Sequence, residues 1–124
     1  MIWVLVGLGG AIGSMARHGV NHVIHQRALG STFPLGVFVV NISGCVVMGI
    51  VAGMLSTGRW HWSIEARTFV AVGLLGGYTT FSSFSLDTIA LVQNGHMLQA
   101  AVNVVGQVTL GLLAVWLGLQ LAAA

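Results

Sequence analysis

The chain has 124 residues, of which 56% are hydrophobic and only 5% are charged: four arginines, no lysine and two acids. An ordinary soluble domain carries about 25% charged residues, so this composition excludes a soluble domain and predicts an integral membrane protein. The net charge of +2 rests on too few groups to indicate a nucleic-acid partner, and the single cysteine cannot form an intrachain disulfide.

Four apolar segments follow one another along the chain, separated by short polar stretches. A helix needs about 20 apolar residues to cross a bilayer, so four spans use nearly the whole length and leave no room for a soluble catalytic domain. No positively charged region precedes the first segment, and we interpret it as a retained span rather than a signal peptide. We predict one all-α transmembrane domain over residues 1–124, with spans at about 2–18, 35–56, 64–92 and 97–121.

The first two spans carry small residues at spacings of three and four, and a more polar tail extends the first span to Gln26. In a bilayer, stripes of small residues let helix backbones approach one another closely. We therefore expect close helix packing along both stripes. The stripe residues are Gly7, Gly9, Gly10, Gly13 and Ser14 in the first span, and Gly36, Ser43, Gly44, Gly49 and Gly53 in the second.

The third span contains the pattern of a broken helix at residues 76–80. Gly76 and Gly77 weaken a helix, and the hydroxyl side chains after them compete for backbone hydrogen bonds. Opened backbone at membrane depth is tolerated only where it is buried in protein or lines a wet cavity. Transporters place ion sites at such breaks, so we expect an ion site here.

The residues at the break offer three kinds of chemistry. Carbonyls freed at 76–79 can coordinate a cation, and the hydroxyls can donate to an anion or accept from water. Phe81 and Phe84 are three residues apart on one face of the resumed helix. Such a pair is usually simple packing, but its electropositive ring edges can also face a small, hard anion. The hydroxyl residues are Thr79, Thr80, Ser82, Ser83 and Ser85.

Four more polar side chains lie in or near the apolar segments. Asn41 in the second span either forms a hydrogen bond between two helices or lines a pore with its amide N–H groups aimed at an anion. Asn103 and Gln107 share one face of the fourth span, where they either line an ion pathway or hold helices together. Asp87, near the end of the third span, is either a functional carboxylate or one that reaches the interface.

The arginines are balanced between the two sides of the predicted membrane domain. Arg17 and Arg27 mark the side of the first loop, and Arg59 and Arg67 mark the other side. Because Lys/Arg bias sets orientation, this chain has almost no topological preference. No internal inverted repeat is visible, and a second copy inserted the other way up would supply it. We therefore predict an antiparallel, dual-topology homodimer.

No catalytic pattern is visible in the sequence. There is no Ser-His-Asp set, no carboxylate pair and no phosphate-binding glycine loop, so we predict no enzyme activity. His18, His22 and His25 lie at helical spacing, but no Cys or acid accompanies them. We interpret them as a solvated interfacial face rather than a metal site.

Three segments resemble the CrcB/Fluc family of fluoride channels. Residues 76–85, GGYTTFSSFS, are similar to the family's GG-x-TTFSTFS signature. Residues 9–17 resemble its first-helix glycine-and-arginine motif, and residues 34–44 its second-helix G-T-x-x-x-N segment. The order of the motifs, the length and the four predicted spans extend the resemblance over essentially the whole chain.

The resemblance implies an antiparallel dimer with two fluoride pathways in the cell inner membrane, which passively exports fluoride and relieves its toxicity. Phe81 and Phe84 would form an aromatic box whose ring edges meet fluoride, and Asn41 would be a pore donor. Backbone carbonyls of Gly76 and Thr79 would hold a structural sodium ion on the dimer axis. The other residues expected along the fluoride pathway are Thr80, Ser82, Ser83, Asn103, Gln107, Arg17 and Asp87.

The chain departs from the family pattern at a few positions. Ser83 stands for the usual Thr, Asp87 for the usual Glu, and Tyr78 for a commonly smaller aliphatic residue. The fourth span has Gly111 and Val115 where family members often show Ser or Thr, with Asn103, Gln107 and Thr109 as possible substitutes.

The alternative function is a small multidrug-type, proton-coupled exporter, which also has four short spans. Such a carrier needs a carboxylate in the middle of a span. The first span has no acid, and Asp87 lies toward a span end. A structural membrane protein without ion flux is a second alternative.

Overall fold

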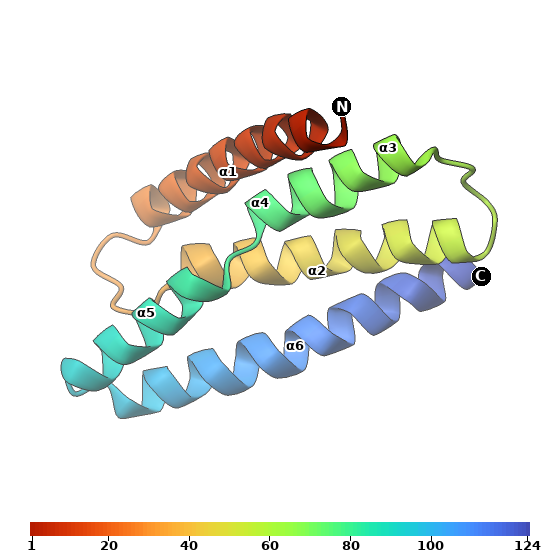
Figure 1. The fold of residues 1–124 in the computed structure, drawn as a ribbon. Coiled ribbons are helices and arrows are strands. Elements are labelled where there is room, and N and C mark those ends of the chain that lie inside the picture. The colour runs from red at the N-terminus through yellow and green to blue at the C-terminus, as the bar shows by residue number, and fades with distance from the viewer.

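The computed structural model describes residues 1–124 as an all-helical fold without strands (Figure 1). The predicted third span is divided into four consecutive elements. In chain order the elements are α1 (Ile2–Arg27), α2 (Leu35–Ser56), α3 (Ile64–Arg67), the π-helix η1 (Thr68–Leu75), α4 (Gly76–Tyr78), α5 (Phe81–Gln93) and α6 (Met97–Ala123).

The helices agree closely with the predicted segments, and α1 includes the expected polar tail. Three helical stretches are long and apolar enough to cross a membrane: Leu35–Ser56, Ile64–Gln93 and Met97–Ala123. The structure therefore supports a multi-pass membrane protein. Glycines and the polar residues from Arg17 onward lower the mean hydropathy of α1, which stays a predicted fourth span.

The helix break is narrower than predicted. Gly76 has helical dihedral angles (φ −64°, ψ −37°), and helix α4 continues to Tyr78. The extended residues are Thr79 (φ −85°, ψ 155°) and Thr80 (φ −150°, ψ 119°). The glycine pair therefore does not itself open the helix. A Cβ on Gly77 would lie 2.6 Å from the Gly10 carbonyl oxygen, so at Gly77 glycine permits close packing against α1.

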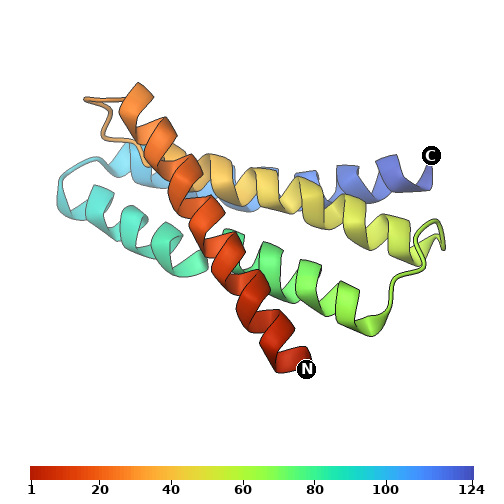
Figure 2. The same ribbon diagram turned by 90° about the horizontal axis from the view of Figure 1, so that it is seen from above.

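The glycine stripes bring two pairs of helices together, as predicted. α2 and α6 lie side by side, and α1 crosses over η1 and α4 (Figure 2). A Cβ on Gly49 of α2 would collide with the Val115 carbonyl oxygen of α6, and one on Gly9 of α1 would lie 2.6 Å from the Phe69 carbonyl oxygen. Neither contact leaves room for a side chain. This packing fixes α4 against α1, and only two residues, Thr79 and Thr80, separate α4 from α5.

Candidate ion site at the helix break

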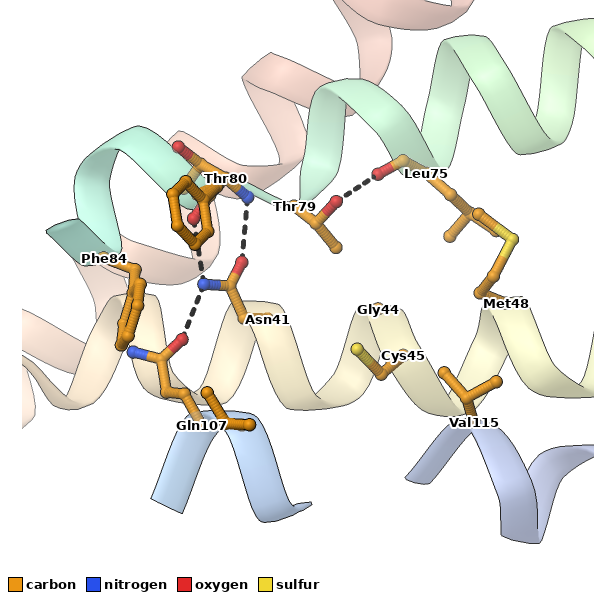
Figure 3. Close-up of a pocket in the computed structure, with 12 residues that line it drawn as sticks. Asn41, Gly44, Cys45, Met48, Leu75, Thr79, Thr80, Phe84, Gln107 and Val115 are labelled. Carbon is orange, nitrogen blue, oxygen red and sulfur yellow. Dashed lines mark hydrogen bonds between the residues drawn. The ribbon is translucent and has the colours of Figure 1, made fainter. Parts of the chain in front are cut away.

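A cavity of about 300 Å³ lies where the third span is broken (Figure 3). Its walls come from α2, the segment around the break, α5 and α6. The cavity therefore gathers predicted site residues that are far apart in the sequence. The predicted residues lining it are Asn41, Thr79, Thr80, Phe81, Phe84 and Gln107.

The break is held open by side chains that take the place of backbone acceptors. The Thr80 N–H donates to Asn41 Oδ1 at 2.8 Å, and the Ser83 N–H donates to Thr80 Oγ1 at 3.2 Å. In a continuous α-helix these two N–H groups would donate to the carbonyls of Gly76 and Thr79. Those two carbonyls, which were the predicted cation ligands, thus lose their helical donors.

Asn41 connects the break to α6. Its Nδ2 donates to the Thr80 carbonyl at 3.0 Å and to Gln107 Oε1 at 2.7 Å (Figure 3). Both amide hydrogens of Asn41 are therefore used inside the protein, which agrees with the interpretation of Asn41 as a hydrogen-bond donor between helices. An anion at Asn41 would have to compete with one of these two acceptors.

The hydrogen-bonded side chains continue from Gln107 along α6 and back to α5. Gln107 Nε2 donates to Asn103 Oδ1 at 3.0 Å, and Asn103 Nδ2 donates to Thr88 Oγ1 at 2.9 Å. The Thr88 hydroxyl donates to the Phe84 carbonyl at 2.8 Å. Sequence reasoning missed Thr88. The available signal is its position four residues after Phe84, where a hydroxyl can reach the carbonyl one turn earlier.

The aromatic pair lies in the first turn of α5, next to the break. The ring centroids of Phe81 and Phe84 are 5.6 Å apart, with an angle of 49° between the ring planes. Both residues line the cavity, yet 79% of Phe81 remains exposed. The expected shared face is confirmed, and the aromatic wall is open on the side of Phe81.

Hydroxyl groups cluster at the start of α5. Thr80 Oγ1 lies 3.3 Å from the hydroxyls of both Ser82 and Ser83. The Thr79 hydroxyl donates to the Leu75 carbonyl, four residues earlier, at 2.9 Å and is thereby occupied locally. The polar environment of the break therefore centres on Thr80.

Six predicted site residues do not line this cavity. Ser82, Ser83 and Asn103 hydrogen-bond to residues that line it, and Gly76 follows the lining residue Leu75 in the chain, whereas Asp87 and Arg17 stand apart. Asp87 lines a second pocket of about 440 Å³ near the loops, together with Thr32 and His96. Arg17 lines neither pocket. On α6, Thr109 is exposed and makes no side-chain hydrogen bond that joins it to the cavity.

The rest of the cavity wall is mostly apolar and was not predicted. A free thiol, Cys45, lies on α2, and Val115 faces the cavity from α6. Tyr78 stands where family members commonly have a smaller aliphatic residue, and its hydroxyl forms a hydrogen bond with Ser43 at 3.0 Å. The remaining lining residues that sequence analysis did not single out are Met48, Leu75 and Val108.

The fold and the site define a multi-pass helical membrane protein with a polar break in its third span. The chain belongs to the CrcB family, since the family described as "CrcB-like protein, Camphor Resistance (CrcB)" matches residues 4–119. The family predicted from the three sequence segments is thus confirmed.

Similar proteins cover nearly the whole chain. "Fluoride-specific ion channel FluC" of Paramagnetospirillum magneticum is 49% identical over 119 residues, which are 95% of this chain and 92% of that protein. "Fluoride-specific ion channel FluC 2" of Nitrobacter hamburgensis is 46% identical, over 98% of this chain and 96% of that protein. A protein of Solibacter usitatus with the first of these names is 45% identical, over 98% of each.

Proposed function

We propose that this protein is a fluoride-selective ion channel that passively exports fluoride from the cytoplasm and relieves its toxicity. The main observation in support of this proposal is the cavity at the helix break, where Phe81 and Phe84 lie beside Asn41 and Thr80. The names of the similar proteins support the same function. The activity is ion conduction and not catalysis.

The chemistry of this cavity suits fluoride. Fluoride is small and strongly hydrated, so a selective pore must replace its water with other donors. Aromatic ring edges carry partial positive charge, and hydroxyls can donate hydrogen bonds. None of these groups carries a fixed charge that would trap the ion, and conduction requires binding that is weak enough for exit.

Fluoride efflux from liposomes tests this function. Purified protein is reconstituted in vesicles loaded with potassium fluoride, valinomycin carries the counter-ion, and a fluoride electrode records efflux. We expect fast fluoride efflux, much slower chloride efflux, and no requirement for a proton gradient. Equal rates for the two halides would contradict the proposal, and a strict proton requirement would favour the multidrug-type exporter.

A structural sodium ion is part of the proposal. Unwound backbone carbonyls coordinate Na⁺ in transporters, and the carbonyls of Gly76 and Thr79 have lost their helical donors to Asn41 and Thr80 side chains. These two carbonyls therefore fit a sodium ion. Bound sodium would supply a fixed positive charge close to the anion pathway.

Thermal unfolding in different salts tests the sodium site. A ligand that binds only the folded state raises its stability, so protein purified in sodium should unfold at a higher temperature than protein purified in N-methylglucamine. Potassium serves as the control for ionic strength. Equal melting temperatures in all three salts would remove sodium from the proposal.

The proposed assembly is an antiparallel homodimer in the cell inner membrane. Two observations support it: the arginines are balanced two against two, and 79% of Phe81 is exposed on one chain. A partner copy would complete the aromatic wall. Arg17 and Asp87 lie outside the central cavity, and we assign both to the end of the pathway on the side of the first loop.

The position of Asp87 also bears on the alternative function. A proton-coupled exporter needs its carboxylate at the substrate site in the middle of a span. Asp87 instead shares a pocket with the loop residues Thr32 and Asn94. No observation on this chain specifically favours the exporter.

A further inference from the structure

Helix α5, which carries the aromatic pair, has little apolar packing within the chain. Of its 13 residues only Leu91 is buried. Leu86 is 71% exposed and Ile89 is 54% exposed. Because the backbone just before α5 is extended at Thr79 and Thr80, the preceding helix does not rigidly set its direction. Within the single chain, polar contacts therefore contribute to the placement of its first turns.

One uninterrupted row of hydrogen bonds makes these contacts. It starts at the Thr80 N–H, passes through Asn41, Gln107, Asn103 and Thr88, and ends at the Phe84 carbonyl. Every donor points in the same direction along the row, so each bond polarises the next. We call these side chains the amide row.

The amide row holds α5 on both sides of the aromatic pair. It is attached to Thr80, immediately before Phe81, and to the carbonyl of Phe84 itself. Its two members on α6 are almost inaccessible to water, since Asn103 is 0% and Gln107 is 8% exposed. At Asn103, which does not line the cavity, water therefore cannot readily replace a lost partner, and breaking the row there leaves buried polar groups without hydrogen bonds.

We infer that Gln107 and Asn103 are positioning residues for fluoride conduction. They hold the Asn41 amide and the first turns of α5 in place, and thereby orient the rings of Phe81 and Phe84, without contacting the ion themselves. This inference rests on the proposed channel function and assigns these two residues one role of the two that the sequence left open. It also explains how a fourth span with Gly111 and Val115 can serve the pathway.

The matched variants are Gln107→Leu and Gln120→Leu. Both replace a glutamine of α6 by leucine, but Gln120 is exposed near the far end of the helix and has no side-chain partner in the row. We expect Gln107→Leu to slow fluoride efflux about tenfold and Gln120→Leu to leave it unchanged. Parental efflux from folded Gln107→Leu would overturn the inference.

A double-variant cycle separates positioning from direct contact with the ion. If Gln107 acts through Asn41, then Asn41→Leu combined with Gln107→Leu should be no slower than Asn41→Leu alone, because neighbours in one network are not additive. Two effects that multiply would show that Gln107 acts on fluoride independently, which contradicts the inference.

Hydrogen exchange gives a readout that does not depend on transport. In the parent the N–H groups of Thr80 and Ser83 donate to side chains of this site. We expect both amides to exchange about tenfold faster in Gln107→Leu and at the parental rate in Gln120→Leu. Unchanged exchange in Gln107→Leu would refute the positioning role.

Thr88→Val provides a milder test if Gln107→Leu does not fold. Valine has the shape of threonine but cannot accept from Asn103 or donate to the Phe84 carbonyl. Faster exchange of the α5 amides is again the expected result, and parental exchange contradicts the inference. A parent that passes no fluoride would refute the channel function alone, because the exchange rates still decide whether the row positions α5.

Discussion

Asn41 shows how a single polar residue organises this membrane protein. An amide in a membrane-spanning helix is costly unless its donors and acceptor are hydrogen-bonded, and the half-buried Asn41 satisfies them with Thr80 and Gln107. The same bonds keep α2, α5 and α6 together around the cavity. The residue that the sequence marks as a candidate pore donor is therefore also a structural centre of the site.

The clearest prediction for a single residue concerns the aromatic pair. Phe84→Ile keeps an apolar side chain of adequate size but removes the electropositive ring edge that we propose for fluoride. We expect fluoride efflux to fall by about tenfold or more, a loss of about 1.4 kcal/mol in transition-state stabilisation, while the protein elutes from size exclusion as the parent does.

Leu86→Ile is the matched control for Phe84→Ile. Leu86 belongs to the same helix, is 71% exposed and does not line the cavity. It should conduct like the parent. If Phe84→Ile also conducts like the parent, the aromatic residues pack the helix but do not serve the ion.

Among the elements, the third span shows that local sequence and packing against other helices together determine the structure of a helix. The sequence pattern correctly locates a break in this span, but the glycines that suggested it remain helical. Eight residues before α4 form a π-helix, Thr68–Leu75, which no sequence pattern indicated. The position of the break follows from contacts with other helices, since Gly77 packs on α1 and the Thr80 N–H donates to Asn41 of α2.

The packing of α1 on the third span gives a prediction for an element. A Cβ at Gly13 would collide with the Leu74 carbonyl oxygen and lie 2.9 Å from the Tyr78 nitrogen, whereas one at Gly19 would meet nothing within 4 Å. We expect Gly13→Ala to destabilise the fold by about 1–3 kcal/mol. Gly19→Ala should be neutral or slightly stabilising, because alanine favours a helix by about 1 kcal/mol over glycine.

Thermal unfolding in detergent compares these two alanine variants. A lower melting temperature for Gly13→Ala alone is the expected result. Equal melting temperatures would mean that the close approach of α1 to the third span does not contribute to stability.

For the whole molecule, insertion in both orientations is the consequence of its charge distribution. With Arg17 and Arg27 on one predicted side and Arg59 and Arg67 on the other, neither side is favoured. We expect a label attached to either terminus to be reached by an impermeant reagent in about half of the molecules in sealed vesicles.

Changing two charges should abolish this balance. Replacing Arg59 and Arg67 by serine leaves only Arg17 and Arg27, which lie on one predicted side. Labelling should therefore become one-sided. The parent is the control. One-sided labelling of the parent would contradict dual topology and, with it, the antiparallel dimer.

The sequence by itself determined the membrane class, the helical segments, the family and the broken third span, because hydropathy, glycine spacing and short motifs are local properties of the chain. It also named the six predicted residues that line the cavity. Only the tertiary structure decided that the break lies at Thr79 and Thr80, that Asp87 and Arg17 stand apart from the cavity, and that Thr88 completes the amide row. The reason is that these outcomes depend on hydrogen bonds and close approaches between helices far apart in sequence, and no local pattern specifies which side chain will reach a given backbone group.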